Sequence, residues 1–446
     1  MSVLAVDPAK LPAGWSLKPL KSVADYFVSN VNKVPDETEE PVRLCNYTDV
    51  YKNEFIRTSM EFMRSTATHR EIEKFRLVVG DVVITKDSET WEDIAVPALV
   101  VESADDLVCG YHLAMLRPFK DHLDGRFLFR CLQSKAIRLA LELASIGVTR
   151  FGLPKGEIGK LQLPIPPRTD QRRIADYLDA ETAEIDALIA EKRRMLALLE
   201  EKRAALVTQA VTRGLDPNVP LKPSGLEWLG KVPAHWRAER LKFHLAQRIE
   251  QGWSPVCENR PADKDEWAVL KVGCVNGDRF NPEEQKALPA DLEPEVRYEI
   301  QENDILMSRG NTLELVGSAS VVPRVRPKLL LCDLLYRCRV ATNRVLPEFG
   351  VHQLRSSVGR FQIEREARGT SASMKKIGQE TIQNFMLMLP PLEEQEQILS
   401  KVRSATVRID MMRDLTMNSI RLLRERRSAL ITAAVTGQIP PEEMIG

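Results

Sequence analysis

Cysteine and histidine are the side chains best able to supply a nucleophile or a metal site in this chain. Seven cysteines occur, none in a CxxC pair, and most sit in apolar runs such as "LLLCDLLYRCRV". Cysteine in such a run is typical of a small buried hydrophobe. The six histidines are scattered without the spacing of metal ligands. We therefore expect structural cysteines and no bound metal.

Short motifs of nucleotide-dependent enzymes and hydrolases do not occur in the sequence. It has no GxGxxG cofactor loop, no GxxxxGK[ST] phosphate loop and no GxSxG nucleophile turn. "NPEE" at Asn281 fails the Asn/Asp-Pro-Pro-aromatic motif of DNA methyltransferases at its third and fourth positions. Glu200, Glu201 and Lys202 have the spacing of a metal nuclease, but acid–base pairing on a solvated helix face explains them better. A non-catalytic chain is therefore expected.

Length and composition limit the class of protein. At 446 residues the chain is too long for one ordinary core, and 43% hydrophobic with 28% charged residues indicates a folded protein. The 63 basic and 63 acidic residues give zero net charge, which disfavours a general polycation that coats nucleic acid. No apolar run reaches a membrane span, and the N-terminus lacks a signal-peptide pattern. We expect a soluble cytoplasmic protein.

The two halves of the chain repeat each other. "PPRTDQRRIADYL" from Pro166 matches "PPLEEQEQILSKV" from Pro390, with Gln171 opposite Gln395. The match continues without a gap to "EKRAALVTQAVTRG" (201–214) against "ERRSALITAAVTGQ" (425–438). The regions before each match repeat more loosely. A fixed long offset of this kind predicts two similar structural units in one chain.

Each half is therefore divided into a variable globular module and a better-preserved helix. A predicted helix ending "LELASIG" in the first module corresponds to one ending "IEREARG" in the second. The expected fold class is α+β or α/β, with two repeated modules and two long antiparallel helices. The boundaries are 1–165 for the first module, 166–214 for its helix, 215–231 for a linker, 232–389 for the second module, 390–438 for the second helix and 439–446 for a tail.

The preserved segments read as long helices with a heptad pattern. Residues 169–211 contain no Pro or Gly, and the Pro pair at 166–167 and Gly214 mark the start and stop. Apolar residues recur every seven positions, interrupted by Lys192 and Thr416 at equivalent places. The partner for each stripe is the other helix, giving an antiparallel pair about 60 Å long; the alternative is packing on its own module. The seam residues are Leu178, Ile185, Leu199, Leu206, Val402, Ile409, Leu423 and Leu430.

The linker carries a family resemblance. It reads Gly-Leu-Asp-Pro from Gly214 and then Ser-Gly-x-x-Trp-Leu-Gly-x-x-Pro-x-x-Trp from Ser224 to Trp236. With the two "PP…Q…I" helix starts, this order resembles the specificity subunits of type I restriction-modification systems over nearly the whole chain. One departure is Thr169-Asp170-Gln171, where the family commonly has Glu-Gln.

The resemblance implies a function and partners. Such subunits carry two target-recognition domains that read the two halves of a split DNA site. They bind two methyltransferase subunits, and two restriction subunits driven by ATP complete the complex. S-adenosylmethionine, ATP and magnesium would sit on those partners, so no cofactor is expected on this chain. Because the modules differ in sequence, we expect unlike half-sites on double-stranded DNA about one helical turn apart.

One pair of loops has the composition of a DNA contact. Residues 147–156 (GVTRFGLPKG) and 369–376 (GTSASMKK) each follow a predicted helix. Glycine allows close backbone approach, hydroxyls bond phosphate or bases, and Lys or Arg supplies charge. An ordinary helix-to-strand connection is the alternative. The candidate residues are Thr149, Arg150, Lys155, Thr370, Ser371, Ser373, Lys375 and Lys376.

A second pair of polar loops, 85–90 (TKDSET) and 308–314 (SRGNTLE), follows two predicted strands. Arg309 and Asn311 have the chemistry for guanine and adenine edges respectively, and Lys86 and Ser88 are the candidates in the first loop. Plain turns are the alternative here. A chain of another class, a coiled-coil adaptor with two protein-binding modules and no DNA readout, is also compatible with the helices alone.

Overall fold

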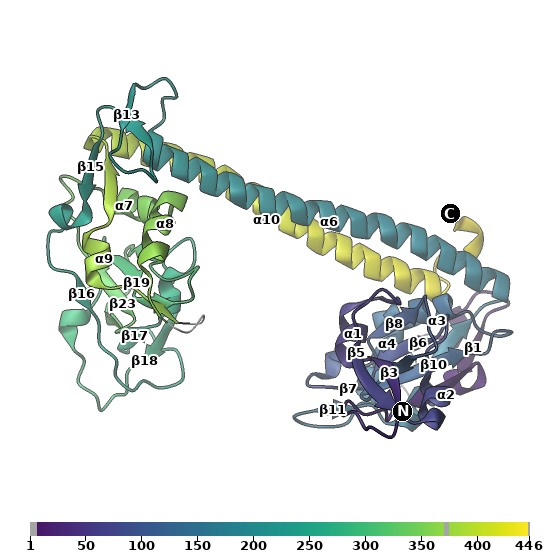
Figure 1. Cartoon of the computed structure of the whole chain (residues 1–446). Coiled ribbons are helices and arrows are strands. Elements are labelled where there is room, and N and C mark those ends of the chain that lie inside the picture. The colour runs from purple at the N-terminus through teal and green to yellow at the C-terminus, as the bar shows by residue number, and fades with distance from the viewer. Residues whose placement is uncertain (1–6, 370–373, 445–446) are drawn as a thin grey trace. The chain divides into compact units, whose positions relative to one another are not determined.

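The structure is a computed structural model that describes residues 7–369 and 374–444. The chain divides into two compact units, Met1–Arg193 with Met417–Gly446 and Arg194–Thr416. Each unit contains one globular module and a part of each of two long helices, α6 (Arg168–Arg213) and α10 (Leu392–Val435). Both can be followed in Figure 1.

The module of the first unit (module 1) is an α+β fold built on a five-stranded sheet in the order β2-β10-β6-β8-β4, with a three-stranded sheet β5-β3-β9. Helices α3 (Gly125–Gln133) and α4 (Lys135–Leu143) belong to the core cluster that includes the five-stranded sheet. The other elements are β1 Ser16–Pro19, β2 Ala24–Val28, β3 Glu40–Cys45, α1 Tyr47–Lys52, β4 Phe55–Ile56, β5 Met63–Ala67, α2 His69–Phe75, β6 Val82–Thr85, β7 Asp87–Ser88, β8 Pro97–Val100, β9 Leu107–Cys109, β10 Leu113–Pro118, β11 Phe151–Gly152, α5 Lys155–Lys160 and β12 Gln162–Ile165.

The module of the second unit (module 2) has a four-stranded sheet β16-β23-β19-β21 and a three-stranded sheet β18-β17-β22. Helices α7 (Pro347–Arg355) and α8 (Ser357–Glu366) follow β23 (Leu335–Cys338) in the chain. The other elements are β13 Leu221–Pro223, β14 Lys231–Pro233, β15 Arg237–Arg240, β16 Glu250–Gln251, β17 Ala268–Leu270, β18 Gln285–Ala287, β19 Ile305–Ser308, β20 Gly310–Asn311, β21 Ala319–Val321, β22 Leu329–Leu330, β23 Leu335–Cys338, β24 Lys375–Lys376, α9 Gln379–Gln383 and β25 Met386–Leu389.

The two modules share one topology. In both, an early strand pairs antiparallel with the last strand: β1 with β12, and β15 with β25. In both, a three-stranded sheet combines one antiparallel and one parallel pairing, β3 with β5 and β9, and β17 with β18 and β22. The helix pairs α3–α4 and α7–α8 also correspond. The predicted fold class, with its repeated modules, is confirmed.

Both long helices begin and end where the sequence signals lie. α6 starts at Arg168, directly after the Pro pair, and ends before Gly214, which has a φ of +78°. The Gly214 amide donates to the Ala210 carbonyl at 3.2 Å, so the left-handed glycine closes the last turn. α10 starts at Leu392 after a second Pro pair and is followed by Gly437, with a φ of +74°.

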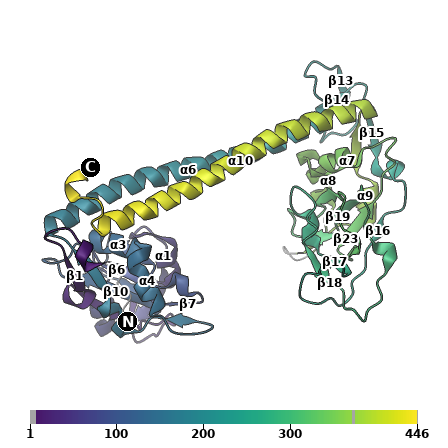
Figure 2. The same cartoon turned by 180° about the vertical axis from the view of Figure 1, so that it is seen from behind.

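In the first unit the start of α6 runs antiparallel to the end of α10. Leu178 of α6 belongs to the same buried cluster as Ile431 and Val435 of α10 and the core of module 1. Arg427 of α10 pairs with Asp186 of α6 at 3.1 Å. The helix stripe therefore faces both the other long helix and the module. Figures 1 and 2 show α6 and α10 side by side.

The second unit repeats this arrangement with the other ends of the helices. Val402 of α10 shares a buried cluster with Ala210 and Val211 of α6. Arg203 of α6 pairs with Asp410 of α10 at 3.7 Å. The predicted antiparallel pairing is thus confirmed in each unit. Among the seam residues, Leu178, Ile185, Leu199, Val402 and Ile409 are buried, and Leu206, Leu423 and Leu430 are half-buried.

Candidate nucleic-acid interface

The structure brings the two candidate loops of module 1 together in one small sheet. β7 pairs antiparallel with β11, so Ser88 lies opposite Phe151 and Asp87 opposite Gly152. Ile146 bridges back to Gly152, which makes residues 146–152 a hairpin on the edge of β7. Loops 85–90 and 147–156, more than fifty residues apart in the chain, therefore form a single projecting ribbon.

Module 2 builds the same ribbon from its own two loops. β20 pairs antiparallel with β24, placing Gly310 opposite Lys376 and Asn311 opposite Lys375. Arg368 bridges to Lys376 as Ile146 does to Gly152 in module 1. The candidates Thr370, Ser371 and Ser373 lie outside the described residues.

The candidate side chains of module 1 differ in exposure. Thr149, Arg150 and Lys155 are exposed, and the Lys155 ammonium lies 5.9 Å from the centroid of the Tyr26 ring. Lys86 is largely buried beside Asp87. Ser88 is buried as well, with its hydroxyl 3.1 Å from that of Tyr47. Thr149 and Arg150 are thus the candidates that this ribbon presents at its tip.

A network around Asp87 supports that tip. The Asp87 carboxylate accepts from the Lys86 ammonium at 2.7 Å and from His112 Nδ1 at 2.7 Å. Burial raises the pKa of Asp87, but these two hydrogen bonds and the nearby positive charges outweigh it, so the pKa stays below its usual value. The exposed Tyr111 ring lies against His112, with ring centroids 3.9 Å apart.

His112 was missed by sequence reasoning. It stands in the apolar run "CGYHLAML", where a histidine indicates a core position. In the structure it has a φ of +72°, an uncommon conformation for a residue other than glycine. Its ring also contacts Arg150, whose Nη2 lies 3.0 Å from His112 Nε2. A short motif search has no signal for such a residue because its partners come from two other loops.

The candidates of module 2 are held by different contacts. Asn311 donates from Nδ2 to Asn276 Oδ1 at 3.1 Å, and its Oδ1 accepts from the Thr312 amide. Lys375 donates to the Gly369 carbonyl at 2.6 Å, while Lys376 is exposed. Arg309 is half-buried, and its carbonyl accepts from the Ile377 amide. Arg309, Asn311, Lys375 and Lys376 are therefore neighbours on one ribbon.

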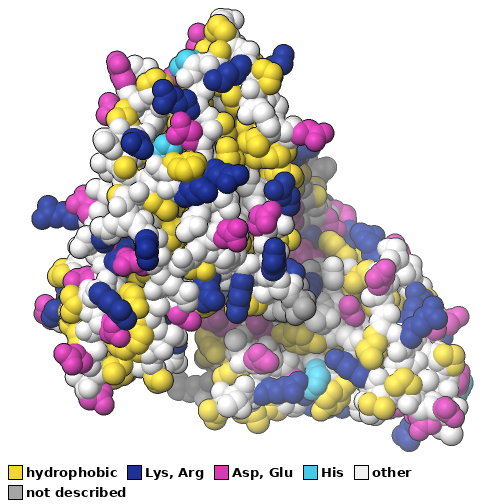
Figure 3. Space-filling view, turned by 60° about the vertical axis from the view of Figure 1, so that its left-hand side comes forward, with side chains coloured by type: hydrophobic (Ala, Val, Ile, Leu, Met, Phe, Trp, Pro, Cys, Tyr) yellow, Lys and Arg dark blue, Asp and Glu magenta, His cyan; other side chains and the backbone are white. Residues whose placement is uncertain are grey.

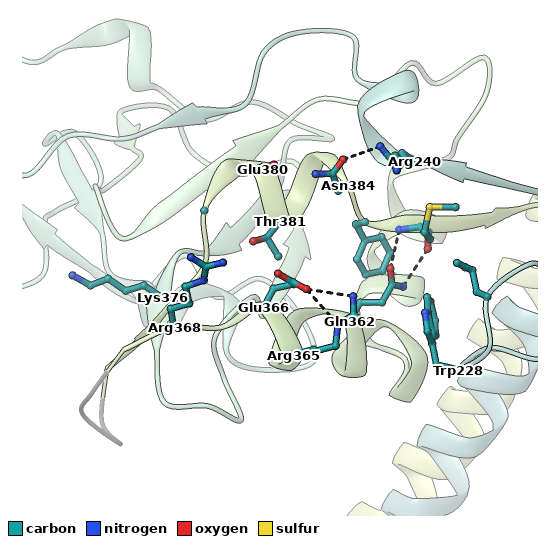
Figure 4. Close-up of a pocket in the computed structure, with 14 residues that line it drawn as sticks. Trp228, Arg240, Gln362, Arg365, Glu366, Arg368, Lys376, Glu380, Thr381 and Asn384 are labelled. Carbon is teal, nitrogen blue, oxygen red and sulfur yellow. Dashed lines mark hydrogen bonds and ion pairs between the residues drawn. The ribbon is translucent and has the colours of Figure 1, made fainter.

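A cleft of about 660 Å³ adjoins this second ribbon. Figure 4 shows Arg368 and Lys376 at one end of it and Trp228, from the linker, at the other. Arg240 also lines it and donates to Asn384 Oδ1 at 3.4 Å. Arg240 and Arg368 were not among the predicted contacts because they lie in a strand and at a helix end. They add basic side chains to a cleft whose lining also includes Glu366 and Glu380.

Charge elsewhere is mixed. On the face shown in Figure 3, basic and acidic side chains are interspersed, as zero net charge requires. The basic cluster at 324–328 is partly structural, since Arg326 donates to the Glu266 carbonyl at 2.8 Å. Glu200, Glu201 and Lys202 are exposed on α6.

No group of His, Cys, Asp and Glu in residues 7–369 and 374–444 is arranged to hold a metal. No helix there is long and apolar enough to cross a membrane. Six of the seven cysteines are buried and Cys257 is half-buried. Burial raises the pKa of the Cys338 thiol to about 12, which disfavours the reactive thiolate.

Each unit thus combines an α+β module that carries a polar ribbon with parts of α6 and α10 that run antiparallel. The family of the type I restriction modification DNA specificity domain matches residues 12–196. Over nearly its full length the chain is similar to specificity subunits of type I restriction enzymes.

Relatives match almost the full length. The EcoKI specificity subunit of Escherichia coli (strain K12) is 22% identical over 97% of this chain and 91% of its own. The putative MjaX specificity subunit of Methanocaldococcus jannaschii is 20% identical over 96% of this chain and 95% of its own. In both comparisons the similarity extends over both halves of the chain.

Solved structures share the fold. A chain from a structure that describes complex assembly and conformational transition of the type I R-M system has a TM-score of 0.68 and 17% identity, covering 96% of this chain and all of that one. The HsdS subunit from Thermoanaerobacter tengcongensis has a TM-score of 0.50 and 18% identity, covering 97% and 99%.

Proposed function

We propose that this chain selects the DNA sequence for a type I restriction-modification complex and leaves the chemistry to its partners. Its substrate is double-stranded DNA with a split site, of which each module reads one half. A two-stranded ribbon fits the major groove, where every base pair presents a distinct pattern of donors and acceptors. S-adenosylmethionine, ATP and magnesium then bind to the partner subunits.

The observation that carries this proposal is the pair of ribbons β7–β11 and β20–β24. They occupy the same topological place in the two modules but present different side chains. Ile146 and Gly152 of module 1 correspond to Arg368 and Lys376 of module 2. A shared scaffold with unlike contact residues is what two unlike half-sites require, because phosphate contacts position a protein while base contacts specify the sequence.

The partners we propose are two methyltransferase subunits and two restriction subunits. Support for a protein-binding surface comes from α10 in the second unit, where Val407, Met411 and Leu415 are 53%, 61% and 66% exposed. Their spacing places them on one helix face. Together with Arg279, Asp410 and Asp414 they line a shallow hollow of about 470 Å³. An apolar stripe with a charged rim is typical of a protein interface.

The test is sequence-specific binding by the assembled complex. The host methylome, sequenced with and without this gene, defines the site. The chain, co-purified with its methyltransferase partner, should bind that duplex at least about a thousand-fold more tightly than a scrambled one. Equal binding to both duplexes contradicts the proposal and favours the coiled-coil adaptor. Methylation by the purified chain alone contradicts its non-catalytic role.

A further inference from the structure

The strongest unassigned feature of the molecule is the set Asp87, His112 and Arg150 in module 1. These residues come from β7, from the turn before β10 and from the hairpin tip. We infer that Arg150 reads a guanine in the half-site of module 1, and that His112, held by Asp87, is the positioning residue that orients the Arg150 guanidinium. This rests on the proposed function and goes beyond it by assigning a base and the residues that read it.

The hairpin tip, residues 147–150, is a tight and exposed turn. Gly147 has a φ of +141°, and a Cβ there would lie 2.0 Å from the Arg150 carbonyl oxygen, so the turn closes tightly on itself. At the tip Val148 is 91% exposed, and Thr149 and Arg150 are exposed beside it. A tight ribbon end with a β-branched, a hydroxyl and a guanidinium side chain matches the width and chemistry of the major groove.

The Asp87 carboxylate holds the His112 ring in place. Its Nδ1 lies 2.7 Å from the Asp87 carboxylate, so Nδ1 carries the proton that it donates. Asp87 is itself fixed by Lys86 and is only 14% exposed. Gly152 leaves room for the Asp87 carboxylate, because a Cβ at position 152 would lie 3.0 Å from Asp87 Oδ1. The left-handed backbone of His112 directs the ring toward the ribbon at the expense of local strain.

Arg150 lies on that ring. Its Nη2 is 3.0 Å from His112 Nε2 and 3.4 Å from Nδ1, so the nitrogen lies over the ring rather than in its plane. A guanidinium held against a ring in this way loses less freedom when it binds, and Arg is the side chain that bonds guanine O6 and N7 together. A contact between Arg150 and a phosphate would require neither the His112 ring nor the Asp87 carboxylate that holds this ring.

The experiment removes one acceptor atom at a time from the DNA. In the duplex bound by the wild-type complex, each guanine is replaced in turn by 7-deazaguanine, which lacks N7. We expect one guanine, in the half-site of module 1, at which replacement weakens binding roughly ten-fold. With Arg150→Ala, replacing this guanine should have no further effect.

Two more variants separate readout from structure. Arg150→Lys keeps the positive charge but removes the planar guanidinium that donates two parallel hydrogen bonds. Binding should therefore lose its sensitivity to 7-deazaguanine and keep its salt dependence. His112→Gly removes the ring and tolerates the left-handed backbone, and it should reduce the effect of replacement below about three-fold. His122→Ala, an exposed histidine elsewhere in the first unit, is the matched control.

The outcomes are distinct. If the wild-type complex prefers its site but no guanine depends on Arg150, the inference is wrong and the proposed function stands. If His112→Gly leaves the full ten-fold effect, the positioning role of His112 is wrong. If the wild-type complex has no sequence preference, the proposed function itself fails. Sensitivity to substitutions in the other half-site should be unchanged in every variant, which reports that the complex is folded.

Discussion

Gln171 and Gln395 stand at equivalent places in the two long helices and make the same three hydrogen bonds. In each, Oε1 accepts from the backbone amide of the N-cap residue of a module helix, at 2.8 Å for Asp124 of α3 and 2.9 Å for Leu346 of α7. In each, Nε2 donates to two carbonyls, those of His122 and Pro166 or of Arg344 and Pro390. Both glutamines are fully buried. One side chain thus joins each long helix to its module.

Replacement of this glutamine should therefore destabilise the unit. Gln171→Met fills similar space but leaves one amide and two carbonyls without partners, and each unsatisfied buried group costs about 1–3 kcal/mol. We expect a loss of at least about 2 kcal/mol in the denaturant unfolding of the first unit. Gln209→Met, at an exposed position of α6, is the control and should change little. Equal stability of both variants would contradict the anchoring role.

A second repeated feature is an arginine that joins three elements. Arg427 of α10 contacts both oxygens of Glu54 in module 1 at 2.8 Å and also Asp186 of α6. Its counterpart in the other unit, Arg203 of α6, contacts Asp278 of module 2 at 3.0 Å and Asp410 of α10.

Removing Arg427 should loosen module 1 from the helix pair. Arg427 is 15% exposed, whereas Glu54 and Asp186 are 40% and 52% exposed, so solvent screens part of the interaction. We expect Arg427→Met to lower the unfolding free energy by about 1–2 kcal/mol, because it leaves two carboxylates unpaired. Arg424→Met on the exposed face of α10 is the control. A double-mutant cycle with Glu54→Gln that shows no coupling would rule out this contact.

The heptad pattern identified the apolar residues of this interface but not the polar ones. Leu178 and Ile409 are apolar, so their spacing marks them as seam residues. A second column of the interface includes the polar Thr182, which is buried, and Arg203 and Arg427, which are mostly covered. A search for apolar periodicity cannot find such residues, because they are buried through hydrogen bonds and ion pairs rather than by the hydrophobic effect.

Composition singled out the four candidate loops, and their contact with DNA stays a prediction. The structure shows that they pair within each module. Which loop meets which depends on contacts between distant strands, and no local pattern records them. The roles of His112 and Asn276 are of this kind, since each acts through a residue of another loop.

Glu348 of α7 should give the second unit a sensitivity to acid. It accepts from Arg403 Nε at 3.0 Å and lies 3.9 Å from His352 Nε2. The nearby His352 ring and the hydrogen bonds from Arg403 lower the pKa of Glu348 to about 2. Because the folded pKa is below the unfolded value, this carboxylate stabilises the fold above about pH 4.3, and that contribution is lost as the pH falls towards 2.

Glu348→Gln should therefore reduce stability at pH 7, and its difference from wild type should shrink between about pH 4.5 and 2. Thermal unfolding followed across this range measures the effect. The control is Glu396→Gln, an exposed position near the start of α10. A difference that stays constant with pH would show that Glu348 contributes by packing rather than by charge.

The turn at Gly147 gives a test of the ribbon that does not change a contact residue. Gly147→Ala introduces a Cβ into the Arg150 carbonyl and a side chain at a φ of +141°, so the hairpin tip must open. DNA binding by the complex should fall about ten-fold or more, with little change in thermal stability, because the tip is exposed. Gly156→Ala, where a Cβ has open space, is the matched control and should bind normally. Normal binding by Gly147→Ala would exclude the tip from the interface.

The length of the helix pair should set the gap between half-sites. α6 passes from the first unit to the second after Arg193, and α10 passes back after Thr416, close to the polar seam positions Lys192 and Thr416. Duplication of residues 186–192 together with 410–416 adds one heptad to both helices and keeps the seam in register. Seven residues add about 10 Å, or about three base pairs of DNA, so the preferred gap should lengthen by about that amount. Binding to duplexes with graded gaps measures it, and duplication in α6 alone, which misaligns the seam, should destabilise the pair instead. A double insertion that still prefers the original gap would show that the helices do not measure the distance.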